Sequence, residues 1–391
     1  MRYTVTSSVP DEFPHDRQLI ALRVYTGSLP GPARVMRPSR LLTLAILASG
    51  ALLVPGKGAA QIEVTSRDAV LRVGGQLDLH YIKASADARS QTFRIRRGWI
   101  TLNARYSDFL EAVFVTDLPN DATVLDAQIR LRFDKSFRVT FGRFKRSFDI
   151  FVLNSISDVQ FLERAGGIPG YDGCDGVGAI CSYGRLSEGL LFANRDSGVR
   201  LDGQVGRFKY QASLTNGTKN GALDDNGHLS SAARLAFPVA EAFTIGVNAT
   251  RKDFNVSRQP FHVDYAKAWG TDIQYGTWRD GLFVQAAYLR GQNWKSAKRV
   301  GNAVPWFSAM QVQGSWYLPW DSDRIEGVEP MVRVSIADSD KQSYMDADLL
   351  FTPGFAAYFR GRSRVSANID LYRSSEDGTF WALRVGTLLY F

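Results

Sequence analysis

Short segments of alternating apolar and polar residues follow one another from Arg72 to the end of this chain, almost without helical periodicity. Turn residues rich in Gly, Asp and Asn separate them. Alternate side chains of a β-strand point to opposite faces, so each segment predicts a strand with one apolar face. About sixteen strands are expected, at residues 72–82, 91–105, 109–117, 123–133, 137–144, 196–205, 207–215, 228–237, 243–251, 267–277, 281–290, 306–317, 328–337, 351–359, 363–372 and 380–391.

The last of these strands, "FWALRVGTLLYF", stays apolar on one face as far as the terminal Phe391. Most domains end in a polar, frayed tail instead. A strand of this kind must be paired along its edges and covered on its outer face, either by a second sheet or by lipid.

The connections between the strands indicate whether a second sheet or lipid covers the apolar face. Tight turns such as "GR" at 206 and "RDG" at 279 alternate with long links such as "TNGTKNGALDDNG" and "RGQNWKSAKRVGNAVP". Short turns on one side and long loops on the other are typical of outer-membrane barrels, and alternation keeps their mean composition close to that of soluble proteins. We therefore predict an all-β, transmembrane antiparallel barrel of about sixteen strands with short periplasmic turns and long outer loops. Its last strand pairs with its first.

The alternative is a soluble β-sandwich or solenoid. A mature chain of this length would then be expected to split into two domains, yet no linker or break in composition marks a boundary.

An export signal is predicted at residues 36–60. The apolar run "LLTLAILASGALLVPG" follows Arg37 and Arg40 and precedes the small residues Gly58 to Ala60, which is the arrangement of a cleavable signal peptide. The alternative is a buried helix. Residues 1–35 fit no part of a signal, so we expect translation to start at Met36 and the mature barrel to comprise residues 61–391.

The two cysteines, Cys174 and Cys181, lie in the Gly-rich stretch "GYDGCDGVGAICSYG". Export places them in an oxidising compartment, which favours a local disulfide over a metal site because no His lies near them. No cofactor or metal is expected. Half of the net charge of +8 lies in residues 1–60, so bulk charge does not indicate a partner such as nucleic acid.

Arginines recur on the predicted inward face of several strands. In "AQIRLRF", Ile129 and Leu131 share one face, so Arg130 and Arg132 lie on the other. The opposite phase would place these charges in lipid, at a cost of about 2–4 kcal/mol each near the midplane. The same reasoning turns inward Arg94, Arg96, Arg138, Arg333, Arg364 and Arg384.

Basic residues are densest in the second, fourth and fifth strands and the connection after them, where Arg97, Arg143 and Arg146 add to the group. A break in the apolar phase predicts a bulge near Arg97 and Gly98. A ring of guanidinium groups would attract anions and bind phosphate oxygens in a bidentate manner. The alternative is an ordinary polar wall, in which the arginines are balanced by Asp78, Asp126 and Asp370.

The longest connection, from about Lys145 to Asn194, is placed to fold inward and narrow the lumen. Here the chain resembles the phosphate-selective porin O and P family, through "FRIRRGWITLNARYSDFLEAVFVTD", "FGRFKRSF" and "SISDVQFLERA". The resemblance implies a trimeric porin with an inward-folded third loop and an arginine ladder. It aligns Arg94, Arg96 and Arg97 with the family's arginine-rich strand, and Lys145 and Arg164 with its loop motif. Arg146-Ser147 stands where the family often has Pro.

The leading hypothesis is therefore an outer-membrane, anion-preferring channel, not an enzyme, for phosphate, pyrophosphate or polyphosphate. Its expected partners are outer-membrane lipid, these anions and the barrel assembly machinery. The terminal Phe391 resembles the signal that this machinery recognises. A general or sugar-selective porin is the alternative within the same fold. An outer-membrane hydrolase would need a base such as His80, but no nucleophile motif is found. A receptor or surface scaffold would need larger ordered outer loops.

Overall fold

The structure, a computed structural model, describes residues 62–65, 69–87, 91–119, 121–155, 158–218, 223–258, 261–298, 303–320, 322–341, 347–359 and 361–391. The predicted upstream extension (1–35) and signal peptide (36–60) lie outside these residues. Among the described residues, no helix reaches the length and apolar character that a membrane span requires.

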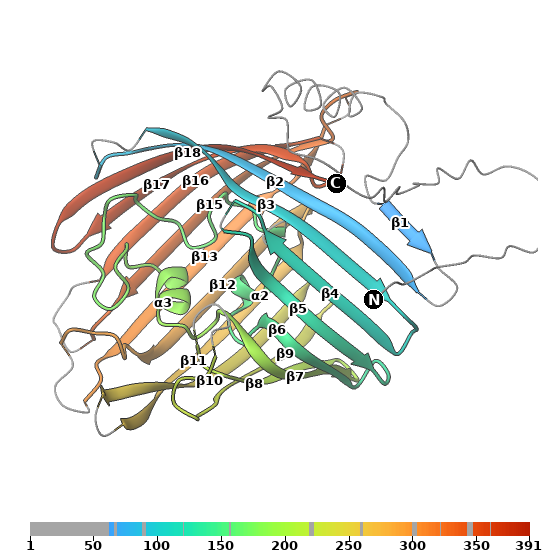
Figure 1. The fold of residues 1–391 in the computed structure, drawn as a ribbon. Coiled ribbons are helices and arrows are strands. Elements are labelled where there is room, and N and C mark those ends of the chain that lie inside the picture. The colour runs from blue at the N-terminus through green and yellow to red at the C-terminus, as the bar shows by residue number, and fades with distance from the viewer. Residues whose placement is uncertain are drawn as a thin grey trace, which may run out of the picture. The chain divides into compact units, whose positions relative to one another are not determined.

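Antiparallel strands follow one another around a closed ring (Figure 1). They are β2 (Val70–Ala84), β3 (Thr92–Arg105), β4 (Leu110–Asp117), β5 (Thr123–Arg132), β6 (Arg138–Lys145), β7 (Arg195–Val205), β8 (Phe208–Thr215), β9 (Ser230–Ala240), β10 (Phe243–Arg258), β11 (Phe261–Thr277), β12 (Asp280–Gln292), β13 (Trp306–Trp316), β15 (Gly327–Asp338), β16 (Asp348–Tyr358), β17 (Arg364–Ser374) and β18 (Gly378–Tyr390). Two short strands, β1 (Ile62–Thr65) and β14 (Leu318–Pro319), pair with β2 and β15. Pairing of β18 with β2 closes a barrel of 16 strands.

Alternation sorts the side chains of each strand between the two faces of the barrel. In β13, Gln311 and Gln313 are buried on the inner face, whereas Met310 is exposed on the outer face and Val312 lies beside it. A polar interior and an exposed apolar exterior are what a barrel surrounded by lipid requires. Closure also leaves no unpaired strand edge in the ring.

The predicted all-β barrel of about sixteen strands is confirmed. The phase break predicted near Arg97 and Gly98 is a bulge in which Arg97 pairs with Asp78 and Ile95 with Leu79, leaving Arg96 as the extra residue. The main differences are at β10 and β11, which extend to Arg258 and Phe261 instead of ending at the predicted 251 and 267.

The connections differ between the two ends of the barrel. Residues 206–207, 241–242 and 278–279 make short turns at one end, and residues 216–229 and 293–305 make long connections at the other. The longest, residues 146–194 between β6 and β7, also leaves from the long-loop end, and we call it the third loop. It carries the helices α2 (Ile150–Leu153) and α3 (Tyr183–Gly189), which lie within the ring of strands (Figure 1).

Candidate functional site

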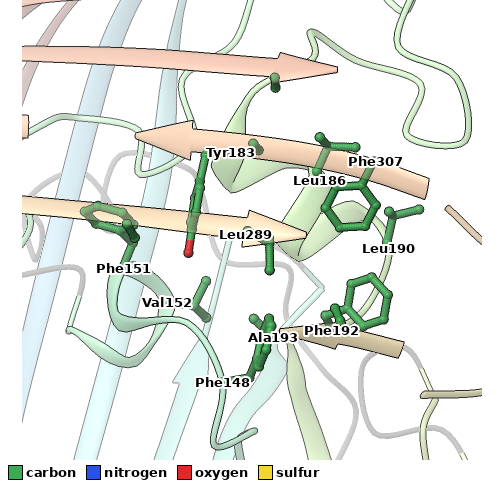
Figure 2. Packing of buried hydrophobic residues seen from close by; sticks show 14 of the residues in the cluster. Phe148, Phe151, Val152, Tyr183, Leu186, Leu190, Phe192, Ala193, Leu289 and Phe307 are labelled. Carbon is green, nitrogen blue, oxygen red and sulfur yellow. The ribbon is translucent and has the colours of Figure 1, made fainter. Parts of the chain in front are cut away.

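An apolar cluster fixes the third loop to one side of the lumen. Phe148, Leu186 and Phe192 of the loop pack against Leu289 of β12 and Phe307 of β13 (Figure 2). The wall here has small residues on its inner face, namely Ala232, Ala266, Ala268, Ala287 and Ala309. These alanines leave room for α3 to approach the strands, and the buried apolar side chains stabilise that position.

Local structure within the loop supports this packing. Ser182 caps α3 by accepting a hydrogen bond from the backbone N–H of Arg185, and Asp149 caps α2 through Phe151. Cys174 and Cys181 are joined by a disulfide bond, and both are buried in the apolar cluster.

Three of the predicted inward arginines hold the backbone of the third loop. Arg333 of β15 donates to the carbonyl oxygens of Glu163 at 2.9 Å and Arg164 at 2.8 Å. Arg364 of β17 donates to the Val159 carbonyl at 2.6 Å, and Arg384 of β18 to the Gly167 carbonyl. A buried loop needs partners for its backbone polar groups, and these arginines provide them.

These three arginines are covered by the loop they hold. The side chains of Arg333 and Arg384 are 0% and 3% exposed, and both contact the carboxylate of Asp370, which is itself buried. Their side chains lie on the inner face of their strands, as the alternation of residues predicts. However, the structure places them behind the third loop, away from the remaining space in the lumen.

Glu163 connects the tip of the loop to the arginines of β3. Its carboxylate lies 2.6 Å from Nε of Arg96, 3.3 Å from Arg94 and 3.5 Å from Arg97. Burial by itself would raise the pKa of Glu163, but the charges of Arg97 and Arg96 outweigh it and hold the pKa well below its usual range. Arg97 also pairs with Asp78, which in turn lies 2.8 Å from His80.

The basic residues at the start of the loop also bind its backbone. Lys145 Nζ donates to the Asn154 carbonyl at 2.6 Å, and Arg164 donates to the same carbonyl at 2.9 Å. Arg146 is buried, and it donates to the Leu191 carbonyl at 2.8 Å. Arg164 and Arg146 therefore position the loop, whereas Lys145 both positions it and faces the space described next.

A cavity of about 340 Å³ remains between the third loop and strands β2 to β8. Leu153 and Ser155 line it from the loop, and Trp99 and Gln128 from the wall. Its charged lining comprises five basic side chains and one carboxylate: Arg130, Lys145, Arg195, Arg200, Arg362 and Asp126.

The cations of this cavity are partly open, and carboxylates lie beside several of them. Arg200 lies 3.2 Å from Asp202, which also pairs with Arg138, and Arg362 lies 3.3 Å from Asp158. The side chains of Arg130 and Arg195 are 22% and 21% exposed, in contrast to the arginines behind the loop. Arg195 lies 3.0 Å from Asp126, and the nearest carboxylate oxygen to Arg130 is that of Glu111 at 3.7 Å.

A second hollow, of about 710 Å³, lies at the short-turn end of the same wall and shares Gln211 with the first. Arg132 and Arg138 line it, paired with Glu111 and Asp202 respectively. Arg143 lies on β6 opposite Ser197 and lines neither of these two spaces.

Sequence reasoning missed Arg195, Arg200 and Arg362 as lining residues. Arg200 could have been found by the same alternation rule, because Val199 and Leu201 beside it are both exposed on the outer face. Arg195 lies at the end of a strand, and Arg362 lies in a turn. At such positions the alternation of residues does not predict which face of the sheet a side chain takes.

Residues 72–260, which span most of β2 and all of β3 to β10, match the family model described as phosphate-selective porin O and P. No curated protein matches the sequence at a significant level. Among solved structures, an anion-selective porin from Comamonas acidovorans is similar with a TM-score of 0.59 at 11% identity, covering 83% of this chain and 100% of that chain.

Two structures of OmpT of Vibrio cholerae are also similar. The outer-membrane expressed protein has a TM-score of 0.56 at 13% identity, covering 84% of this chain and 100% of that chain. A trimer form has a TM-score of 0.54 at 12% identity, covering 83% and 99%. At these identities the likeness shows the fold, and together with the family match it indicates a channel rather than an enzyme. The molecule is an outer-membrane porin, and its residues 72–260 match the model of the phosphate-selective porin O and P family.

Proposed function

We propose that this porin conducts anions, with a preference for phosphate and its condensed forms, through the space between the third loop and strands β2 to β8. The observation that carries the proposal is the lining of the 340 Å³ cavity, with five basic side chains and a single carboxylate. Such a wall in a narrow, low-dielectric channel produces a field that attracts anions and repels cations.

The register of β5, β6 and β7 supports a path with several weak sites in series. Lys145 and Arg195 are cross-strand partners nearest the third loop. Arg130 and Arg200 flank Thr140, five residues closer to the short turns along β6, and Arg132 pairs with Arg138 at the short-turn end. Several partly compensated sites allow an ion to enter and leave, whereas one tight site would block the flow. Guanidinium groups match the geometry of phosphate oxygens, which favours phosphate over a monatomic anion.

A sugar-selective channel would be expected to have an aromatic track on its inner wall. The inward aromatic group of Trp278, Tyr317 and Tyr358 instead packs around the guanidinium of Arg279, with the Tyr358 centroid at 4.6 Å. This arrangement does not favour the sugar alternative.

The proposal is tested by replacing Arg130, Arg195 and Arg200 together with Gln and measuring reversal potentials across a planar bilayer in a salt gradient. The change removes positive charge from the lumen and introduces no charge into lipid, so the barrel should still fold and insert. We expect the preference of the wild type for anions, on the order of tenfold at low salt, to fall towards unity or reverse.

Arg373→Gln is the matched control, because Arg373 is exposed on the outward phase of β17. Its reversal potential should equal that of the wild type. An unchanged reversal potential in the inserted triple variant would refute the anion pathway, and chloride currents that phosphate does not reduce would refute phosphate preference.

We also propose the assembly context of the channel. The basic flank, apolar core and small residues at 36–60 support cleavage after Ala60 and export to the outer membrane. The family match and the trimer form of the similar OmpT barrel support a homotrimer. We propose that Phe391, an aromatic residue that follows β18 and is 49% exposed, acts as the signal for barrel assembly.

A further inference from the structure

The outer surface of the barrel has an apolar hollow of about 660 Å³ across β7 to β11. Its floor is a row of small side chains in register, with Ala212 opposite Ala233 and Ala233 opposite Ala249. Leu201 and Trp269 continue the row on either side and form the walls. These side chains have the outward phase of their strands, so the hollow faces away from the lumen.

Basic side chains border this hollow towards the long-loop end. Arg251 of β10 and Lys267 of β11 are exposed, line the hollow and are directly opposite each other in the strand register. Arg290 of β12 is exposed opposite Trp269, in the same row as Ala249. Within the described part of the chain, none of the three forms an ion pair.

This arrangement is unfavourable without an anion. Like charges directly opposite in an antiparallel pair repel each other, and a cation on the lipid-facing side of a barrel costs free energy if it lies in the hydrocarbon. Arg251 is held in place by stacking on Tyr265, with its guanidinium carbon 3.5 Å from the ring centroid. The guanidinium is therefore pre-positioned at the edge of the hollow.

The level of these cations matches a headgroup layer. Arg251 is eight residues beyond Phe243, at the short-turn end of β10, and Lys267 is ten residues before Thr277, at the same end of β11. With about 3.3 Å per residue and a tilt near 40°, they lie roughly 20–25 Å above that end. The apolar band of such barrels is about 25 Å tall, so the cations lie at its outer boundary.

We propose that this surface binds one lipid of the outer leaflet that has a phosphate-bearing, anionic headgroup, with acyl chain in the hollow and headgroup on Arg251 and Lys267. Charge complementarity selects this occupant. A second copy of the chain is a poorer match, because the outward charged residues at the same end of β2 and β17, Lys83 and Arg373, are also basic. The lipid site is independent of the anion pathway.

The test uses the full mature protein in detergent, with bound lipid measured by native mass spectrometry. Phosphatidylglycerol and phosphatidylcholine with identical acyl chains are the anionic and zwitterionic probes. We expect the wild type to retain phosphatidylglycerol preferentially, and Arg251→Gln/Lys267→Gln to lose this affinity by roughly 30-fold, because two cations near the headgroup are removed. Ala233→Phe should fill the hollow and reduce the retention of both lipids.

Lys83→Gln/Arg373→Gln is the matched control and should retain phosphatidylglycerol as the wild type does. The proposal is overturned by equal retention of the two lipids, by equal losses in the control and the test pair, or by inorganic phosphate displacing the lipid completely. Cross-linking between copies through an Ala233→Cys variant would overturn it in favour of a subunit interface. If Ala233→Phe does not fold, the Gln pair alone decides, because it removes charge from the lipid face without adding volume.

Discussion

At the scale of single residues, Glu163 is the side chain through which the tip of the third loop reaches β3. Its carboxylate contacts Arg94, Arg96 and Arg97, while its backbone carbonyl accepts a hydrogen bond from Arg333 on the other wall. Arginines of two separate wall segments therefore converge on one residue. Loss of the carboxylate would leave Arg94 and Arg96 without their acidic partner, whereas Arg97 would keep Asp78.

We predict that Glu163→Gln lowers the free energy of unfolding by about 3 kcal/mol, the usual cost of removing one partner of a buried ion pair. The measurement is urea unfolding of the detergent-refolded barrel, followed by tryptophan fluorescence. Glu241→Gln, in an exposed turn, is the control and should have almost no effect. If both variants unfolded alike, Glu163 would not anchor the loop.

Asp149 has the opposite electrostatic environment. It is buried at the start of α2, where it accepts hydrogen bonds from the Ser187 hydroxyl and the backbone N–H of Phe151. Burial raises its pKa from 3.8 to about 6, and these hydrogen bonds offset only part of that effect. The folded protein therefore holds this proton more tightly than the unfolded chain does.

The pH dependence follows from this shift. The contribution of Asp149 to stability is fully present below about pH 3.8 and declines as pH rises through about 6. Asp149→Asn keeps a side chain that tolerates the positive φ of this residue, 68°, but it cannot ionise. We expect the difference in unfolding free energy, wild type minus variant, to decrease between about pH 4 and pH 6 and then level off. A difference that is constant with pH would show that Asp149 does not titrate in this range.

At the scale of elements, periodicity predicted the strands and the inward phase of residues such as Arg130, Arg333 and Arg384, because the pleat fixes which face each residue takes. It could not predict that Arg333 and Arg384 hold the third loop. Those contacts join residues 163–167 to residues far away in sequence, and the sequence pattern of one strand contains no information about them. The extensions of β10 and β11 were missed because "RKDFNVSR" lacks an apolar alternation.

The position of the third loop should depend on Arg333. It is buried, donates to two loop carbonyls and pairs with Asp370 at 3.0 Å. We predict that Arg333→Gln loosens the loop and raises single-channel conductance and current noise, with a stability loss of about 3–5 kcal/mol. Arg373→Gln again serves as the control. Conductance and noise that match the wild type would contradict the anchoring role.

At the scale of the whole molecule, the barrel closes at its last residue. Phe391 exchanges two backbone hydrogen bonds with Gly75 of β2, at 2.6 and 3.0 Å. A Cβ atom on Gly75 would lie 2.4 Å from the Phe391 ring, so the ring would have to move if this position carried a side chain. The ring itself remains 49% exposed, which limits its contribution to packing.

We predict that deleting Phe391 reduces the amount of porin at the cell surface much more than it reduces refolding in detergent, as expected if the residue acts in assembly as we propose. Surface levels from intact cells and refolding yields in vitro are compared for the variant and the wild type. Equal losses in the two measurements would mean that Phe391 is structural instead.

The charge selectivity of the whole channel can be measured as the reversal potential of the wild type in a tenfold potassium chloride gradient. The basic wall formed by Arg130, Lys145, Arg195 and Arg200 predicts a reversal potential with the sign that chloride permeation gives. The magnitude of this potential should decrease as the salt concentration is raised, because salt screens the charges. A potential near zero, or one of the sign for potassium permeation, would mean that this wall does not make the channel anion-selective.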